Sequence, residues 1–201
     1  MRPFSPRRAE ALTALLLTRE PGPTAAEHAA SGRRGMEQLM SETVAVTGAT
    51  GFVGRALIER LAAAGLRPRA LVRRGEVLGT STVRGDLDDA GALADLVRDA
   101  AHVVHLAGVV KAPEPAAFAR VNAGGTERLA RAMAKGTGRL VLVSSLAARH
   151  PEVSAYAGSK RAAEDVALEI LGPERVTILR PPAVYGPGDR ATLLIFRQLA
   201  S

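Results

Sequence analysis

Two side chains four positions apart, Tyr156 and Lys160, have the types and spacing for acid–base chemistry. Positions i and i+4 share one face of a helix, so the pattern places an ammonium beside a phenol. A free phenol has a pKa of about 10, and a neighbouring positive charge favours the phenolate. Ser145, at the end of an apolar run, is placed to hydrogen-bond a substrate oxygen. The pattern therefore predicts proton exchange with a small molecule by Ser145, Tyr156 and Lys160.

A glycine-rich segment, GATGFVG, follows a short β-branched run. In a dinucleotide fold Gly48 permits a tight turn, Gly51 lets the backbone approach a pyrophosphate, and Gly54 lets the next helix lie against the sheet. Amide groups at the start of that helix would face the anion. A structural turn is the alternative, but the strand before and the amphipathic helix after favour nucleotide binding. The expected cofactor contacts are Gly48, Thr50, Gly51, Phe52, Val53 and Gly54.

Arg73 and Arg74 stand at the end of the second expected strand. An acidic residue there would accept from the ribose hydroxyl of NAD, whereas a guanidinium grips a 2′-phosphate with forked hydrogen bonds. Arg55, just after Gly54, is placed to assist. The sequence therefore favours NADP over NAD, with Arg73 as the contact. The alternative is that these arginines are simply solvated, in a chain rich in arginine.

Apolar runs and amphipathic stretches alternate from Thr43 onward, which predicts alternating strands and helices. The expected strands cover 43–47, 69–72, 81–83, 101–106, 140–144 and 176–179. The expected helices cover 52–64, 89–100, 115–135 with a break at Gly124-Gly125, and 156–171. Such alternation implies right-handed crossovers and a parallel sheet covered on both faces. The residues that follow the strands then gather at one edge, where such sheets bind ligands.

Composition excludes several classes of protein. The 201 residues are 47% hydrophobic and 23% charged, as in globular proteins, and the absence of cysteine excludes disulfides, thiolate metal sites and a cysteine nucleophile. The net charge is +7, but the arginines are scattered and aromatic residues make up only 3%. Both features argue against a protein that binds nucleic acid. No apolar stretch approaches the roughly 20 residues of a membrane span. With no visible secretory signal, the expected location is cytoplasmic.

The chain divides near residue 41 into two expected parts. Residues 1–40 are predicted to be a poorly structured extension with one short helix over 8–20, and 41–201 to form an NAD(P)-binding domain. A simpler hypothesis is that the protein starts at Met36 or Met40 and that the leader is an artefact of the gene model.

Several motifs occur in a fixed order: TGATGFVG, HLAG, VNAGGT, a serine pair, YAGSK and RPPAVYGPGD. Over residues 41–190 they resemble the extended short-chain dehydrogenase/reductases, the NAD-dependent epimerase/dehydratase family. The resemblance implies a Rossmann-like, doubly wound parallel sheet in three αβα layers. It implies that Tyr156 exchanges the proton, that Lys160 tunes Tyr156 and holds the ribose, and that Ser145 orients the substrate oxygen. Ser144 would then support the residues that contact the substrate, without contacting the substrate itself.

Further cofactor contacts implied by the resemblance lie after the strands: Asp86, Leu87, Ala107, Gly108, Asn122, Pro181 and Val184. Asp86 would accept from the adenine amine, or would be only an acid near a helix N-terminus. Asn122 is expected to support the active-site backbone first and to take part in catalysis second. His105, alone in an apolar strand, is expected to be a hydrogen-bonded core residue, and no metal site is expected.

The resemblance implies hydride transfer between a nicotinamide and a carbonyl or carbinol carbon. A nucleotide-sugar epimerase or dehydratase shares that step, and Arg73 tilts the interpretation towards a reductase. A non-catalytic NAD(P)-binding module or an inactive fragment is a further alternative, although Tyr156 and Lys160 are both present. Family members continue beyond Ser201, so the chain is expected to be truncated and to lack most of the substrate subdomain. Its helix-like end, 191–200, would expose apolar residues. A homodimer is left open.

Overall fold

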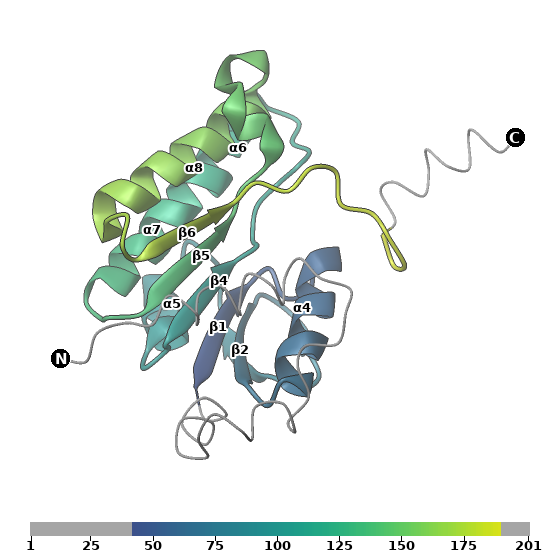
Figure 1. Cartoon of the computed structure of the whole chain (residues 1–201), viewed down its shortest axis with the longest axis vertical. Helices are drawn as coiled ribbons and strands as arrows, with labels where there is room; N and C mark the ends of the chain where they lie inside the picture. Colours follow the sequence, from purple (N-terminus) through teal and green to yellow (C-terminus); the bar gives the residue numbers. More distant parts are fainter. Residues whose placement is uncertain (1–41, 190–201) are drawn as a thin grey trace, which may run out of the picture.

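The computed structural model describes residues 42–189, in which six parallel strands form one sheet (Figure 1). The strands are β1 (Thr43–Thr47), β2 (Arg67–Val72), β3 (Ser81–Arg84), β4 (His102–His105), β5 (Arg139–Val143) and β6 (Val176–Leu179). Their order is β3-β2-β1-β4-β5-β6, so the winding reverses between β1 and β4. This arrangement is the doubly wound, Rossmann-like sheet that the sequence predicts, and its reversal point is where such sheets bind ligands.

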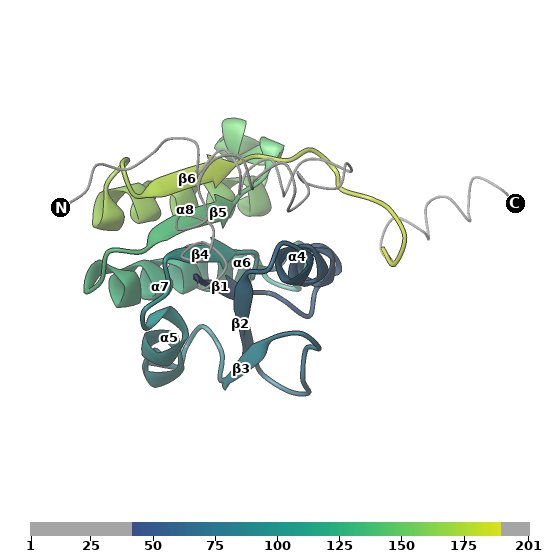
Figure 2. The same ribbon diagram turned by 60° about the horizontal axis from the view of Figure 1, so that its bottom comes forward.

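Helices cover both faces of the sheet, as Figure 2 shows. They are α4 (Phe52–Ala63), α5 (Ala90–Val97), α6 (Pro115–Phe118), α7 (Gly124–Ala134) and α8 (Ala155–Leu171). A π-helical turn, η2 (Ala119–Ala123), joins α6 to α7, and two 3-10 turns, η3 (Leu146–Arg149) and η4 (Pro151–Val153), precede α8. Helix α4 lies on one face, while α5, α7 and α8 pack side by side on the other.

Strand β1 is the centre of two apolar layers. Val44 and Val46 pack with Leu57 of α4, whereas Ala45 packs with Leu96 and Leu129 on the opposite face. All three β1 residues are fully buried. Alternate residues of a strand point to opposite faces, so a continuous apolar run is what a strand buried on both sides requires.

Strand β2 begins two residues earlier than the sequence predicts and contains Pro68. Arg67 donates its backbone N–H to the carbonyl of Glu42, on the β1 side. Neighbouring N–H groups point to opposite sides of a strand, so a proline at 68 lacks its donor on the β3 side. Pairing with β3 starts only at Arg69, opposite Ser81, so no ladder bond is lost.

The predicted break does not fall at Gly124-Gly125, because these glycines are the first two residues of α7. The irregular turn comes just before, in η2, which contains Asn122. Gly125 serves packing instead: a Cβ there would lie 2.6 Å from Leu87 Cδ1. The expected limits at residues 64 and 115 agree with the structure, since Gly65 follows the end of α4 with φ +75° and Pro115 begins α6.

Some expectations lie outside the described residues. They are the helix over 8–20, the alternative starts at Met36 and Met40, and the helix-like end over 191–200. Within residues 42–189, no helix has both the length and the apolar character needed to cross a bilayer.

Candidate active site

The glycine-rich loop turns the chain sharply from β1 into α4. Gly48 has φ +75°, and a Cβ there would lie 2.7 Å from the backbone nitrogen of Ala107, at the end of β4. The Gly51 N–H donates to the Gly48 carbonyl at 3.0 Å and closes the turn. Gly48 is thus required by both its dihedral angle and the neighbouring strand.

The start of α4 is suited to an anion. Gly51 caps the helix with no side-chain acceptor, and the first turn contains no acidic residue. Gly51 is exposed, and among residues 42–189 only the Gly48 carbonyl oxygen, at 3.2 Å, lies near its hypothetical Cβ. The first-turn amides and the positive end of the helix dipole therefore face an open surface, as the pyrophosphate of a dinucleotide requires.

Gly54 is fixed by contact between helix and loop. A Cβ at this position would lie 2.1 Å from the Gly48 oxygen and 2.7 Å from Ala49 Cα. Both contacts are with backbone, which cannot give way without moving the loop.

We expect Gly54→Ala to lower the free energy of unfolding by about 1–3 kcal/mol or more, because the overpacked methyl must push α4 away from the loop. The affinity for NAD(H) should fall as well. Thermal and urea unfolding, with fluorescence titration of NADH, measure both effects. Gly91→Ala in α5 is the control, because its nearest atom is Asp89 Oδ1 at 3.4 Å. A Gly54→Ala protein as stable as the parent would contradict the packing argument.

The residues expected at the adenosine half surround the ends of β2 and β3. Arg73 and Arg74 follow β2 and are exposed. Arg55 turns back onto the glycine loop, where Nη1 donates to the Thr50 carbonyl at 2.8 Å. Asp86 accepts from the Asp88 N–H at 2.9 Å, while Asp89, three residues later, caps α5 through the Ala92 N–H. The helix-capping acid is therefore Asp89 rather than Asp86.

Leu87 is held in place from two sides. Its carbonyl accepts from Arg128 Nε at 2.7 Å, and its side chain packs against Gly125. Arg128 also pairs with Asp88 at 2.5 Å. Helix α7 thereby fixes the loop between β3 and α5.

Asn122 joins the loop after β4 to helix α8. Its Oδ1 accepts from the Val109 N–H at 2.8 Å, and its Nδ2 donates to the Val109 carbonyl at 3.1 Å and to Ser159 Oγ at 2.9 Å. A Cβ at Gly108 would lie 2.9 Å from Asn122 Oδ1. The side chain is 2% exposed, so all its polar atoms serve the backbone support that the sequence predicts.

His105 is confirmed as a hydrogen-bonded core residue. It is 1% exposed and lies between Thr47 Oγ1, 2.6 Å from Nδ1, and Thr126 Oγ1, 3.1 Å from Nε2. Burial, with a smaller contribution from the charge of Lys160, lowers the pKa of His105 to about 3. The ring is therefore neutral at neutral pH.

The carboxyl end of β5 presents Ser144 and Ser145. Ser145 is half-buried, and its Oγ accepts from the Ala147 N–H at 3.2 Å, which caps the 3-10 turn η3. The next residue, Leu146, donates its N–H to the Pro181 carbonyl at 2.9 Å. The segment after β6 is thus tied to the turn that carries Ser145.

Tyr156 and Lys160 lie on the first two turns of α8. Ser154 caps the helix by accepting from the Ala157 N–H at 3.1 Å. The half-buried Tyr156 ring packs edge-on against Phe118, with the ring centroids 6.0 Å apart. Lys160 is 9% exposed, and Nζ donates to the Val143 carbonyl at 2.7 Å. Burial lowers the pKa of Lys160 to about 8, against the opposing effect of Glu164.

Glu164 is a site residue that the sequence reasoning missed. It lies one turn beyond Lys160, is 1% exposed, and accepts from Arg180 at 2.9 Å (Nε) and 2.5 Å (Nη2). Ser144 Oγ is hydrogen-bonded to the same carboxylate. Burial opposes ionisation, but the bonds from Arg180 and Ser144 outweigh it and lower the pKa of Glu164. The available signal was an acid at i+4 from Lys160 on the apolar face of α8.

The last described segment, which contains Pro181 and Val184, leaves β6 at the same edge and runs towards α4 (Figure 1). Gly186 and Gly188 lie against Phe52 of the glycine loop, since their hypothetical Cβ atoms would be 3.7 and 4.0 Å from its ring. Val184 is exposed. Segments after β1, β4, β5 and β6 therefore meet at one edge, with Tyr156 and Lys160 beside the end of β5.

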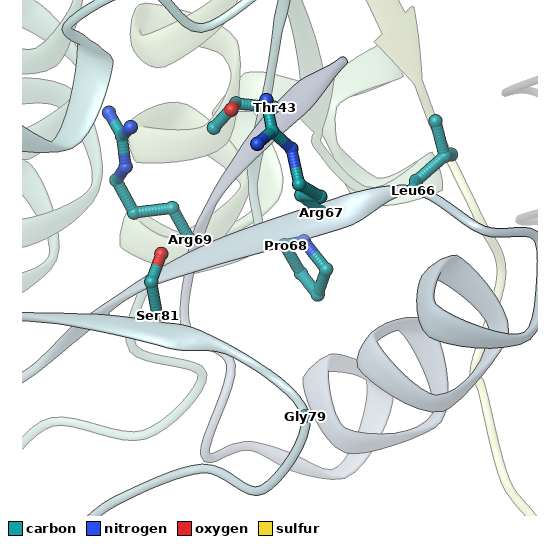
Figure 3. Close-up of a pocket in the computed structure, with 7 residues that line it drawn as sticks. All are labelled: Thr43, Leu66, Arg67, Pro68, Arg69, Gly79 and Ser81. Carbon is teal, nitrogen blue, oxygen red and sulfur yellow. The ribbon is translucent and has the colours of Figure 1, made fainter. Parts of the chain in front are cut away.

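Two cavities in the described part lie away from this edge. One, of about 400 Å³, is lined by the first residues of β1, β2 and β3, including Thr43, Arg67 and Ser81 (Figure 3). The other, of about 570 Å³, lies between the carboxyl ends of α5 and α7. Both open at the amino ends of the strands, opposite Tyr156, and no chemistry-bearing cluster accompanies them. No group of three or more acids and histidines within residues 42–189 could hold a metal ion.

The fold and this edge define a doubly wound α/β protein with a serine, a tyrosine and a lysine at the carboxyl ends of its strands. The NAD dependent epimerase/dehydratase family matches residues 44–200. The chain belongs to this family.

The relatives include reductases and a UDP-glucose 4-epimerase. The chain is 49% identical to a ceramide reductase of Caulobacter vibrioides over 164 residues, 79% of this chain and 51% of that protein. It is 34% identical over 152 residues to a UDP-2-acetamido-2,6-beta-L-arabino-hexul-4-ose reductase of Pseudomonas aeruginosa, covering 73% and 37% of the two chains. The chain thus spans about half the length, or less, of these relatives.

A solved structure of MoeE5 in complex with UDP-glucuronic acid and NAD matches with a TM-score of 0.67 and 30% identity. The match covers 78% of this chain and 59% of that one. A short-chain dehydrogenase/reductase superfamily protein from Agrobacterium tumefaciens with bound NAD matches with a TM-score of 0.62 and 28% identity, over 69% and 48% of the chains. The family is NAD-dependent, and these neighbours hold NAD.

Proposed function

We propose that this chain forms the cofactor-binding and proton-transfer part of an NAD(P)-dependent reductase that acts on a ketone carbonyl. The observation that carries the proposal is the placement of Tyr156 and the buried Lys160 one turn apart on α8, where Lys160 Nζ reaches the last residue of β5. The glycine loop and α4 begin at the same edge, so a dinucleotide lying across the reversal point would reach these side chains.

Tyr156 gives its phenolic proton to the carbonyl oxygen during reduction, and takes it back during oxidation. When bound, the nicotinamide supplies or accepts the hydride. Ser145 Oγ donates to the same substrate oxygen and orients the carbonyl. Lys160 remains mostly an ammonium at neutral pH, since its pKa is about 8, and its charge stabilises the phenolate. Lys160 would also hold the ribose hydroxyls.

The cofactor half involves the residues expected from the sequence. The amides of Gly51, Phe52 and Val53 bind the pyrophosphate, while Thr50 and Gly54 shape the loop around it. Asp86 and Leu87 lie against the adenine, and Ala107 and Gly108 against the ribose. Pro181 and Val184 contact the carboxamide, and Asn122 supports the backbone beneath. Lys160 and Tyr156 complete the set.

The substrate is proposed to be a long-chain, apolar ketone of the ceramide type. The ceramide reductase of Caulobacter vibrioides, at 49% identity, supports this. Exposed apolar side chains follow the strands on the catalytic half of the sheet: Val110, Leu146, Val153 and Val184. Such surface would suit a hydrocarbon chain, and burial of that chain would add about 25 cal/mol per Å².

A nucleotide-sugar epimerase or reductase is the second candidate, supported by the MoeE5 complex with UDP-glucuronic acid and NAD. Oxidation of NADPH or NADH by the full-length protein, with a ceramide-type ketone in one assay and UDP-sugars in another, separates the two. Turnover of the lipid ketone alone supports the first proposal. Conversion of a UDP-sugar alone overturns it in favour of the second, and binding of cofactor without turnover of either would indicate a non-catalytic module.

NADP is proposed as the preferred cofactor, bound through the exposed Arg73. We expect Arg73→Asp to shift the ratio of NADPH to NADH affinity towards NADH by at least about tenfold, because a charged hydrogen bond contributes about 1.5–3 kcal/mol. Fluorescence titration with both cofactors measures the ratio. Lys135→Asp makes the same charge change at the end of α7 and should leave the ratio unaltered. An unchanged ratio in Arg73→Asp would argue against the phosphate contact.

The domain boundary at residue 41, a cytoplasmic location and a homodimer stay predictions. Light scattering of the purified protein measures the oligomeric state.

A further inference from the structure

Three buried side chains outside the proposed proton transfer form a line behind the site. Thr47 ends β1, His105 ends β4 and Thr126 lies in α7. None is more than 1% exposed. The His105 ring bridges the two hydroxyls, with Nδ1 2.6 Å from Thr47 Oγ1 and Nε2 3.1 Å from Thr126 Oγ1. The carboxyl ends of the two central strands, β1 and β4, are thus connected to helix α7 on one face of the sheet.

Counting donors assigns the direction of every bond in this line. The Thr126 hydroxyl donates its one hydrogen to the Asn122 carbonyl at 2.7 Å, so it must accept from His105 Nε2–H. Nδ1 then carries no proton and accepts from the Thr47 hydroxyl. Thr47 Oγ1 in turn accepts from the Ala107 N–H at 3.2 Å. His105 is therefore the neutral Nε2–H tautomer.

The line continues through Asn122 to the helix that carries the tyrosine. Asn122 Nδ2 donates to Ser159 Oγ at 2.9 Å, and the Ser159 hydroxyl donates to the backbone carbonyl of Tyr156 at 2.7 Å. Hydrogen bonds, joined within Asn122 by the residue itself, therefore connect the backbone of Ala107, beside Gly48, to the backbone of Tyr156. No side-chain N or O atom buried within the described residues lacks a partner.

We propose that His105 is a positioning residue, which as a neutral Nε2–H tautomer fixes the helix bearing Tyr156 and Lys160 relative to the strand ends that would hold the cofactor. The inference rests on the proposed function for its effect on turnover. A fully satisfied buried network is rigid, and a single missing partner leaves a buried donor unpaired.

The groups around His105 keep its ring in the neutral Nε2–H tautomer. Protonation at Nδ1 would point a second N–H at Thr47 Oγ1, whose own hydrogen would then lose its acceptor. Lys160 is the charged group that acts on the ring, and its ammonium opposes a second positive charge. Both effects favour one tautomer over the whole working range of pH.

The test compares two substitutions at Thr126 in the full chain. Thr126→Val keeps the shape but removes the acceptor, whereas Thr126→Ser keeps the hydroxyl and loses the methyl. We expect Thr126→Val to lower kcat by about tenfold or more, because the buried Nε2–H is left without a partner and the ring no longer holds α8 in position. Its KM for cofactor should stay within about twofold, and Thr126→Ser should restore most of the kcat.

Nitrogen-15 NMR of the histidine rings supplies a readout that does not depend on activity. At pH 7 we expect His105 to show a protonated Nε2 and a bare Nδ1. Amide hydrogen exchange in the first turns of α8 should be faster in Thr126→Val than in Thr126→Ser. These measurements remain decisive even if the chain proves to have no reductase activity.

A protonated Nδ1, or a doubly protonated ring at pH 7, would overturn the inference. Equal kcat in folded Thr126→Val and the parent would do so too, as would equal exchange in α8. If Thr126→Val does not fold, two measurements still test the inference. They are the protonation state of His105 in the parent protein and the amide exchange of α8 in Thr126→Ser compared with the parent.

Discussion

Replacing Tyr156 with phenylalanine is expected to lower kcat by about 100- to 10,000-fold, the range for loss of a positioned general acid. The substitution removes only the hydroxyl, so the ring remains packed against Phe118 and the α8 cap at Ser154 is untouched. The affinity for NADPH or NADH should change by less than about threefold, since the phenol forms few of the cofactor contacts. Steady-state kinetics and fluorescence titration separate the two effects.

Tyr185→Phe is the matched control, because Tyr185 is the second of the two tyrosines and is exposed on the segment after β6. It should keep kcat within about twofold. Equal activity of Tyr156→Phe and the parent would reject the acid–base role. An equal loss in both variants would move that role away from α8.

Replacing Arg180 with methionine is expected to lower the free energy of unfolding by about 3 kcal/mol at pH 7. Glu164 is 1% exposed, and Arg180 supplies two of its hydrogen bonds. Without Arg180 the buried carboxylate keeps one hydrogen bond, from Ser144, and the weaker effect of the Arg161 charge. Removing one partner of a buried ion pair typically costs about 3–5 kcal/mol. We expect the lower end, because the Arg180 side chain is 34% exposed and solvent screens part of the pair.

The pH dependence has a defined sign. The pKa of Glu164 is lowered in the folded protein, so its contribution is complete above the unfolded pKa of about 4.3 and is lost as pH falls through the folded value. In Arg180→Met the buried carboxyl takes up a proton more readily, which removes the unpaired charge. The deficit relative to the parent should therefore be smaller at pH 4 than at pH 7, as measured by urea unfolding.

Arg161→Met is the control for this prediction. Arg161 pairs with Asp165 on the same helix, and their side chains are 44% and 62% exposed. Its charge also helps to lower the pKa of Glu164, but less than any other group that does so. Exposed pairs contribute about 0–1 kcal/mol, so this variant should unfold close to the parent. If Arg180→Met lost no more stability than Arg161→Met, the buried carboxylate would not anchor β5, β6 and α8 together.

Local sequence patterns were sufficient to predict the main strands and helices of this protein. β1 matched its predicted bounds because a β-branched run between polar residues has one plausible conformation, and α8 began one residue early because Ser154 rather than Ala155 caps it. The roles of Gly48 and Gly54 followed from a spacing that only a strand–turn–helix accommodates. Tyr156 and Lys160 were found together because a helix brings i and i+4 onto one face.

Local patterns misjudged elements whose form depends on distant neighbours. The Gly124-Gly125 pair was predicted to break the helix, but the two glycines begin α7. Gly125 is required there because the side chain of Leu87, 38 positions earlier, occupies the space that a Cβ would fill. Pro68 fits inside β2 only because β3 begins one residue further along the ladder. Neither fact is encoded within a few residues of the position concerned.

The sequence by itself determined the parallel sheet, the glycine-rich turn after β1 and the Tyr-Lys pair, because each depends on the regular period of a helix or strand or on glycine's freedom at single positions. Only the tertiary structure decided the support beneath them. Thr47 and His105 are 58 positions apart, and Glu164 and Ser144 are 20 apart, so their hydrogen bonds exist only once the strands are aligned. Long-range polar contacts depend on distance and direction in space, and no spacing along the chain specifies either.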